Sequence, residues 1–403
     1  MEKGSFKWMK SLNRSIVLNI IRTQGPISRA KIARVSKLTP PTVSSLVNEL
    51  LESELVIESE QGKSLGGRKP TMLIINSNRF YIIGVDIGPK KIRAALTDLS
   101  GDLVEAVGNT IPHAIDENEL VILLKKSISK LIESHQNKEI IGIGVGMHGV
   151  VDVATGTSVF APNLNLRNIP LKEELEKEYN VLVKVDNDVR AMAFGEYWYS
   201  DVETSKNMVT VNIGHGVGAG IVLNGELFHG DHFLAGEIGH MTIDVAGRKC
   251  TCGNTGCWQT LVSGPAIAEI AKEKSVQHPE TDILSLVNGD VDKINGETVY
   301  SAATNGDALA IEILQEAGDV IGIGLTNLIH MLNPEKIIIG GGVAKASEFI
   351  LPRVKDTIAK RGITNQAKST LISCSKQGKN ATAMGAAALV LGEIFEGSTP
   401  IVE

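Results

Sequence analysis

This sequence has few cysteines and no long uninterrupted apolar stretch, so neither a disulfide framework nor a membrane span is expected. The 403 residues include only four cysteines, too few to cross-link so long a chain. No apolar stretch is long enough to cross a membrane without charged, polar or glycine interruptions. The N-terminal lysines are not followed by the apolar segment of a signal peptide. We therefore expect a protein of the reducing cytoplasm that has no membrane partner.

Aromatic residues are scarce as well, at 4%, but the apolar fraction of 43% is ordinary for a globular protein. That fraction excludes a mainly disordered chain. A length of 403 residues exceeds what one hydrophobic core normally supports, so two or three domains are expected.

Basic residues are outnumbered by acidic ones over most of the chain, but they are in excess at its start. Residues 1–70 contain 12 Lys+Arg and 6 Asp+Glu, whereas the remainder contains 28 and 40. A basic head on an acidic body is typical of a protein whose head alone meets nucleic acid. Chance clustering on a solvated surface explains the charge equally well, so the residue pattern has to decide.

The head has the pattern of a helix-turn-helix. Apolar residues recur at helical spacing over 13–23. Ser28 is placed to cap a short helix over 29–35, and Thr39 is placed to cap a second one that has Pro40 at its first position. Two short helices joined by a tight turn, after a supporting helix, form this DNA-binding motif.

Exposed residues of the second helix and nearby basic residues are the predicted contacts to DNA. Small hydrogen-bonding side chains suit base edges in a major groove, and basic side chains suit phosphates. Two predicted strands, 56–60 and 71–75, flank a basic, glycine-rich segment, 61–70, that resembles a wing. The predicted DNA-binding residues are Arg29, Lys31, Lys37, Thr42, Ser44, Ser45, Asn48, Arg68 and Lys69. A helical protein-interaction module is the alternative, and the wing together with the charge favours DNA.

Beyond residue 80 the periodicity becomes that of an α/β or mixed-sheet body. Strands are expected over 81–87, 92–98 and 103–107, a helix over 119–133, and a strand with a glycine-rich loop over 140–152. A similar strand–glycine–strand opening recurs from Met208. Two lobes of similar build imply a cleft that would take a small ligand.

The strongest chemical signal is His240 followed by Cys250, Cys252 and Cys257. Three of the four cysteines fall in this short stretch. One imidazole and three thiolates make a closed tetrahedral set suited to structural Zn²⁺, with no open position for hydrolytic chemistry. Reduced core cysteines or a redox pair are the alternatives, and a C-x-C spacing suits both poorly.

Several motifs together resemble those of the ROK family (repressors, open reading frames and sugar kinases). The motifs are VDIG at Val85–Gly88, the loop 142–152, DND at Asp186–Asp188, Gly214–Gly220, GEIGH at Gly236–His240 and CTCGNTGC at Cys250–Cys257. With the predicted winged head, about the full length is similar to the repressor branch, which includes xylose, N-acetylglucosamine and glucose-transport repressors.

The resemblance implies a fold and a domain plan. The fold class is α/β with an α+β head: a winged helix-turn-helix followed by a two-lobed, actin-like and ribonuclease-H-like sugar-kinase fold. The expected domains are the head at 1–78, a first lobe at 79–190 with the C-terminal helix 380–403 packing back on it, and a second lobe with the zinc loop at 191–379.

The resemblance also implies a sugar site. The family's sugar contacts carry over to Asn163, Asn187, Asp188, Glu237, His240 and Gln259. His240 is then both a sugar contact and a zinc ligand. The family usually has a glutamate at the position of Gln259, and an amide donates as well as accepts hydrogen bonds. This departure affects which sugar binds and how tightly.

Two further departures distinguish the chain from the kinases of the family. Their D-x-G-G-T loop for ATP phosphates is Asp86-Ile87-Gly88-Pro89-Lys90 here, and their G-T-G loop is Gly214-His215-Gly216. Proline removes an N–H donor, and phosphoryl transfer depends on positioned phosphate contacts. Asp188 matches the catalytic base of these kinases, but without a held phosphate it can still serve as a sugar ligand.

We therefore expect no enzyme activity and predict a repressor of carbohydrate genes, with xylose or a related sugar as effector. A homodimer or higher homo-oligomer would bind operator DNA and release it when sugar enters the cleft. An ATP-dependent sugar kinase with an added DNA-binding head is one alternative. A constitutive DNA-binding protein with an inactive sugar pocket is the other.

Overall fold

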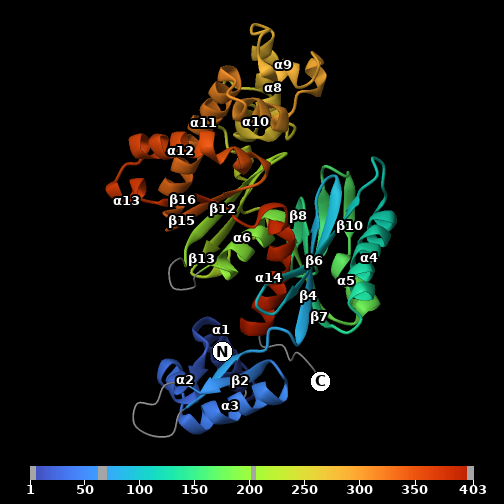
Figure 1. The fold of residues 1–403 in the computed structure, drawn as a ribbon, viewed down its shortest axis with the longest axis vertical. Coiled ribbons are helices and arrows are strands. Elements are labelled where there is room, and N and C mark those ends of the chain that lie inside the picture. Colours follow the sequence, from blue (N-terminus) through green and yellow to red (C-terminus); the bar gives the residue numbers. More distant parts are fainter. Residues whose placement is uncertain (1–5, 62–69, 201–205, 397–403) are drawn as a thin grey trace. The chain divides into compact units, whose positions relative to one another are not determined.

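The computed structural model describes residues 6–61, 70–200 and 206–396, and its chain divides into two compact units (Figure 1). The first unit comprises the residues up to Val202 and those from Thr382 onward, and the second runs from Glu203 to Ala381. The first unit thus contains the head and one α/β lobe. Among the helices described, none has both the length and the apolarity that a membrane crossing requires.

The head is built from helices around a small antiparallel sheet. Its elements are α1 (Phe6–Gln24), β1 (Ile27–Ser28), α2 (Arg29–Ser36), α3 (Pro40–Glu52), β2 (Val56–Gln61) and β3 (Thr71–Ile75). The sheet has the order β1-β3-β2, so the two predicted wing strands pair as a hairpin. The predicted wing tip between them, including Arg68 and Lys69, lies outside the described residues.

The two predicted caps start the two short helices. The Ser28 hydroxyl accepts from the Lys31 N–H at 3.3 Å, and the Thr39 hydroxyl accepts from the Thr42 N–H at 3.4 Å. Each such cap stabilises its helix by about 1 kcal/mol. Pro40 stands at the start of α3, where its missing N–H costs nothing. The buried stripe of α3 is Val43, Leu46, Val47 and Leu50.

The first lobe is a mixed five-stranded sheet of order β11-β7-β4-β5-β6. Its strands are β4 (Phe80–Ile87), β5 (Lys91–Asp98), β6 (Leu103–Thr110), β7 (Glu139–Met147) and β11 (Leu182–Asn187). The helices are α4 (Glu117–Ser134), α5 (Leu171–Tyr179), α6 (Asp188–Trp198) and α14 (Ala381–Glu396). A small sheet, β8 (Val150–Asp152), β9 (Thr157–Ala161) and β10 (Leu166–Ile169), completes the lobe. β4, β7 and β11 run parallel, so their carboxyl ends share one edge.

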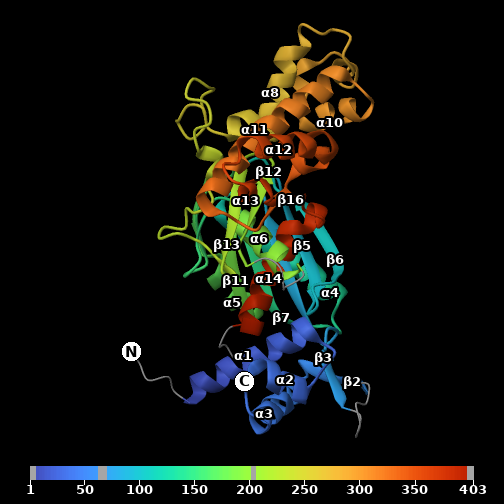
Figure 2. The same cartoon turned by 90° about the vertical axis from the view of Figure 1, so that its left-hand side faces the viewer.

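Glycines in the central strands bring α14 directly onto this sheet, as Figure 2 shows. A Cβ at Gly84 would lie 1.9 Å from the carbonyl oxygen of Ala383, and one at Gly144 would lie 1.8 Å from that of Ala386. Backbone atoms cannot approach so closely, so a side chain at either glycine would push the helix away. The last helix of the chain is therefore part of the first lobe's core.

The second unit repeats the strand plan of the first lobe. Its sheet has the order β14-β13-β12-β15-β16. The strands are β12 (Met208–Ile213), β13 (Val217–Leu223), β14 (Glu226–Leu227), β15 (Lys336–Gly340) and β16 (Leu371–Cys374). In both sheets the first three strands form an antiparallel meander, and two later strands add in parallel beside the first. The two lobes of similar build predicted from the sequence are confirmed.

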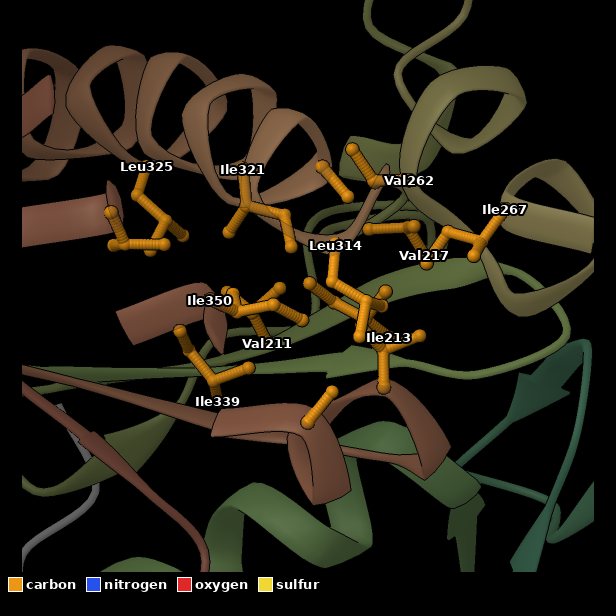
Figure 3. Packing of buried hydrophobic residues seen from close by; sticks show 14 of the residues in the cluster. Val211, Ile213, Val217, Val262, Ile267, Leu314, Ile321, Leu325, Ile339 and Ile350 are labelled. Atoms are coloured by element: carbon orange, nitrogen blue, oxygen red, sulfur yellow. The ribbon is translucent and has the colours of Figure 1, made fainter. Parts of the chain in front are cut away.

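A long helix and its neighbours cover one face of this second sheet. The helices are η1 (Ile238–His240), α7 (Gln259–Val262), α8 (Gly264–Ser275), α9 (Asp282–Ser285), η2 (Val291–Lys293), α10 (Gly296–Thr304), α11 (Ala308–Leu332), η3 (Gly342–Ala346), α12 (Ser347–Arg361), α13 (Asn365–Lys368) and η4 (Gly378–Asn380). In Figure 3, Leu314 and Ile321 of α11 lie over Val211 and Ile339 of the strands, with Ile350 of α12 beside them. The buried Trp258, which directly follows Cys257, packs in this core and anchors the cysteine-containing loop 250–257 to it.

Candidate functional site

Helix α3 carries the side chains that are predicted to contact bases. Ser45 and Asn48 are exposed, and Thr42 and Ser44 are half-buried. Arg29 donates to the Asn48 side-chain oxygen at 2.8 Å and to the Ser44 carbonyl at 3.4 Å. Because Arg29 holds the oxygen of Asn48, the amide nitrogen is the group that Asn48 offers to a base acceptor.

Two of the predicted phosphate contacts lie on α2 and at its end. Lys31 and Lys37 are both exposed, and Lys37 ends α2 in the left-handed conformation with φ of 58°. Both residues precede α3 in the chain. Lys and Arg in such positions orient a helix-turn-helix by binding the DNA backbone.

Four predicted metal ligands come together in the second unit. The ligand atoms of His240, Cys250, Cys252 and Cys257 all lie within 4.8 Å of one another. The Cys252 and Cys257 sulfurs are 3.7 Å apart, and the Cys250 sulfur is 3.7 Å from His240 Nδ1. Sulfur ligands at about 2.3 Å from a tetrahedral zinc stand about 3.8 Å from one another. A disulfide bond is about 2 Å long, so these cysteines are reduced, and the convergence of four ligand atoms suits a metal better than a two-cysteine redox pair.

The loop that carries the cysteines depends on two glycines. Gly253 and Gly256 have φ of 95° and 74°, and a Cβ at Gly256 would lie 1.5 Å from the Asp244 carbonyl oxygen. The Cys250 N–H donates to the Asn254 carbonyl at 2.8 Å, which closes the turn between the thiols. Only glycine adopts these angles without strain, so the backbone itself directs the sulfurs inward.

Two of the predicted sugar contacts in the second unit lie against the metal ligands. The Glu237 carboxylate is 3.9 Å from His240 Nε2, on the far side of the ring from the thiol. Gln259 donates to the Cys250 sulfur at 3.2 Å, and a Cβ at Gly216 would lie 3.2 Å from its oxygen. The structure therefore brings Glu237, His240 and Gln259 together. If His240 bound a metal through Nδ1, its Nε2 would stay free of the metal and lie on the side of the Glu237 carboxylate.

Asn187 and Asp188 lie at the carboxyl edge of the first lobe's parallel strands, where β11 turns into α6. The Asn187 oxygen accepts from the N–H groups of Val189 and Arg190 at 2.9 and 3.2 Å, and its amide donates to the Gly149 carbonyl at 2.9 Å. Most of the hydrogen-bonding capacity of Asn187 is thus used by the fold. One amide hydrogen remains for a ligand.

Two carboxyl groups share this edge in a poorly solvated environment. Burial first, and then the nearby charge of Asp188, raise the pKa of Asp86 to about 7, while Arg93 opposes the shift from 3.2 Å. Loss of solvation also raises the pKa of Asp188, and His148 acts against that rise. Carboxyl groups that lack water and lie near each other favour ligands that supply hydrogen-bond donors, such as hydroxyls.

The remaining predicted sugar contact, Asn163, lies in the turn between β9 and β10 and is exposed. Its neighbour Pro162 packs against the loop that holds Asn187, since a Cβ at Gly149 would lie 2.8 Å from the proline Cδ. The first unit therefore gathers the Asn163 turn and the Asn187–Asp188 pair around one loop.

Three residues at this edge of the sheet, Asp86, Arg93 and His148, are not among the sugar contacts predicted from the sequence. Asp86 was assigned only to a phosphate loop, and His148 lies within the glycine-rich loop 142–152. A histidine flanked by glycines directly after an apolar strand was the signal available. Arg93 offered none, because an arginine in a strand ordinarily faces solvent.

The two altered phosphate loops use their glycine N–H groups internally. The Gly88 N–H donates to the Lys91 carbonyl at 3.1 Å, and the Gly214 N–H donates to the Gly216 carbonyl at 2.9 Å. Both are turns between antiparallel strands. One N–H donor in each turn is thus used within the turn, and Pro89 supplies none.

Comparisons with known proteins agree on the family. Residues 82–393 match the ROK family. The chain is 32% identical over 394 residues to the xylose repressor of Caldicellulosiruptor bescii, covering 97% of this chain and 98% of that protein.

Two solved structures are also similar. A ROK family transcriptional regulator described as a homologue of the Escherichia coli MLC protein has a TM-score of 0.85 at 29% identity, covering 96% of this chain and 97% of that one. A ROK family glucokinase from Streptomyces griseus, solved with glucose and AMPPNP, has a TM-score of 0.69 at 30% identity, covering 77% of this chain and 98% of that one.

Proposed function

This chain belongs to the ROK family, and from that premise we propose that it is a sugar-responsive transcriptional repressor and not a sugar kinase. The observation that carries the proposal is the match over the full length, head included, to a protein named xylose repressor. The glucokinase similarity covers less of the chain. The occupied glycine N–H groups at Gly88 and Gly214 further favour a body that no longer positions ATP.

The head is assigned to operator DNA, with α3 in the major groove and the wing at the backbone. The DNA contacts are Arg29, Lys31, Lys37, Thr42, Ser44, Ser45, Asn48, Arg68 and Lys69. A homodimer or higher homo-oligomer would place two heads on successive major grooves of a palindromic operator. The domain plan of 1–78, 79–190 with 380–403, and 191–379 belongs to the same proposal, except that all of α6 lies in the first unit, which extends to Val202.

The effector is a small carbohydrate, with xylose or a related sugar as first candidate. Its contacts are Asn163, Asn187, Asp188, Glu237, His240 and Gln259. Their oxygens, amides and ring nitrogen match a ligand that offers several hydroxyls. Zn²⁺ at His240 and the three cysteines would be structural. It would stabilise the loop from which Glu237 and Gln259 extend.

A binding screen and an activity assay together test this function. Under the proposal, one sugar from a panel of D-xylose, D-glucose and N-acetylglucosamine raises the melting temperature, because a ligand that binds the native state stabilises it. The same sugar weakens operator binding. A coupled ATPase assay with the same sugars should show no turnover. Turnover of ATP to a sugar phosphate would establish the kinase, and no response to any sugar would favour a constitutive DNA-binding protein.

Helix α6 offers a route from the sugar site to the DNA-binding head within the first unit. Its first residue, Asp188, is a proposed sugar contact, and its last residue, Trp198, meets the head. The guanidinium of Arg22, on α1, lies 3.8 Å from the Trp198 ring centroid and donates to the Trp198 carbonyl at 3.5 Å. Eleven helical residues span about 16 Å, so a shift at one end reaches the other as a rigid body.

Arg22→Ala is expected to uncouple sugar from DNA. The cation–π contact contributes about 1 kcal/mol, and its loss should reduce the sugar-induced drop in operator affinity roughly fivefold. Sugar affinity without DNA should change little, since Arg22 is remote from Asp188 on α6. Titration of labelled operator with and without sugar measures the coupling. Thr23→Ala, on the next residue of α1, is the matched control, and equal coupling in both variants would contradict this route.

A further inference from the structure

His148 is a buried histidine with half of its hydrogen-bonding capacity unused. Its side chain is 5% exposed at the end of β7. Its Nδ1 lies 3.0 Å from the Ile87 carbonyl oxygen, and its backbone N–H donates to the same oxygen at 3.3 Å. Its Nε2 is buried and has no hydrogen-bond partner among the residues that the structure describes.

The Ile87 contact fixes the tautomer of the neutral ring. A carbonyl oxygen only accepts, so Nδ1 must carry the hydrogen. In the neutral imidazole Nε2 is then a bare acceptor. A buried acceptor without a donor is unfavourable, so this atom calls for a partner that the described part of the chain does not supply.

The surroundings of Nε2 define what that partner is. His148 lies close to the Asp188 carboxyl group. The next residue, Gly149, has φ of 92° and accepts the Asn187 amide at 2.9 Å, which ties the histidine loop to the Asn187–Asp188 pair. A Cβ at Gly149 would lie 2.2 Å from the Phe160 carbonyl oxygen, so the loop has no room to move away.

We propose that His148 is a further sugar-contacting residue, and that its Nε2 accepts a hydrogen bond from one hydroxyl of the carbohydrate held by Asn187 and Asp188. The inference rests on the proposed sugar response and adds a contact to it. A hydroxyl has one hydrogen, and in this arrangement it donates that hydrogen to Nε2 while its oxygen stays free to accept from the Asn187 amide. The contact therefore selects a ring hydroxyl over a hydrogen at that carbon.

Two substitutions separate a ligand contact from a structural role. His148→Asn keeps an amide donor at the position of Nδ1 for the Ile87 carbonyl and removes Nε2. His148→Gln extends its amide to the position of Nε2 and gives up the short reach to Ile87. A purely structural role of the Ile87 hydrogen bond would make the Gln variant the less stable one, whereas a ligand contact makes the Asn variant the weaker sugar binder.

Calorimetric titration with D-xylose, D-glucose and N-acetylglucosamine tests the proposal. The expected result is a loss of tenfold or more in sugar affinity for His148→Asn, with a melting temperature close to that of the unsubstituted protein and partial retention of affinity in His148→Gln. Deoxy analogues of the bound sugar locate the hydroxyl. The analogue that lacks it should bind the unsubstituted protein and His148→Asn equally, as a double-mutant cycle requires.

A failure of the proposed function can be told apart from a failure of the His148 assignment. If the unsubstituted protein binds none of these sugars, the proposed function fails and this contact fails with it. If it binds one of them and His148→Asn binds that sugar equally well, only the assignment of His148 is overturned. A ¹⁵N spectrum of the imidazole gives an independent readout, because the Nε2 shift should change on adding sugar only if a hydroxyl donates to it.

Discussion

Cys252→Ser is expected to abolish stoichiometric zinc binding and to lower the melting temperature by roughly 10 °C. Cys252 supplies one of the ligand atoms that lie within 4.8 Å of one another, and a serine hydroxyl does not replace a thiolate on Zn²⁺. Without the metal, nothing would offset the repulsion and desolvation of the remaining sulfurs. Elemental analysis gives the zinc content, and differential scanning calorimetry gives the melting temperature.

Cys374→Ser is the matched control. Cys374 is half-buried at the end of β16 and is not among the candidate ligands. Its substitution should leave the zinc content unchanged. Full zinc content in Cys252→Ser would refute the metal centre, and loss of zinc without loss of stability would show that the metal has no structural role. Sugar affinity should fall along with zinc, because Gln259 contacts the Cys250 sulfur.

The second large effect is expected on the recognition helix. Ser45→Glu should weaken operator binding about 100-fold, because it replaces an exposed hydroxyl of α3, predicted to contact a base, with a carboxylate that would face a polyanion. The helix itself should tolerate the change, since Ser45 is exposed and glutamate favours helices. Fluorescence anisotropy with labelled operator measures the affinity, and its fall with rising salt should be steep.

Gln136→Glu makes the same change of net charge on the body of the protein. Gln136 is exposed beyond the end of α4, far in the sequence from the head. Its operator affinity should match that of the unsubstituted chain. If both variants weaken binding alike, the loss reports overall charge and not contact by α3. If neither does, α3 is not the recognition helix.

Local patterns were enough to predict the elements and the metal ligands. The apolar pattern located the strand 71–75 at its observed bounds, and Ser28 and Thr39 were predicted as caps because a cap acts within its own turn. The cysteine cluster was predictable for the same reason, because Cys250 to Cys257 form one short loop. Each of these features depends on residues that are neighbours along the chain.

The cluster of Asp86, His148 and Asp188 at the carboxyl edge of the first lobe's parallel strands was not predictable in this way. Asp86, His148 and Asp188 end or follow three different strands, and only the parallel order β11-β7-β4 brings those ends together. The contact between Arg22 and Trp198 likewise joins a head helix to the end of α6. Sequence periodicity says which face of an element is buried but not which distant element covers it.

Local spacing and composition were sufficient to predict the basic head with its caps, the alternation of strands and helices, and the candidate metal ligands. Three features became visible only in the packed fold: Gln259 donates to a cysteine sulfur, the Asn187 amide bonds both α6 and the Gly149 carbonyl, and the buried Nε2 of His148 has no partner among the described residues. Hydrogen-bond satisfaction depends on which backbone and side-chain groups meet across the fold, and that is settled when the elements pack.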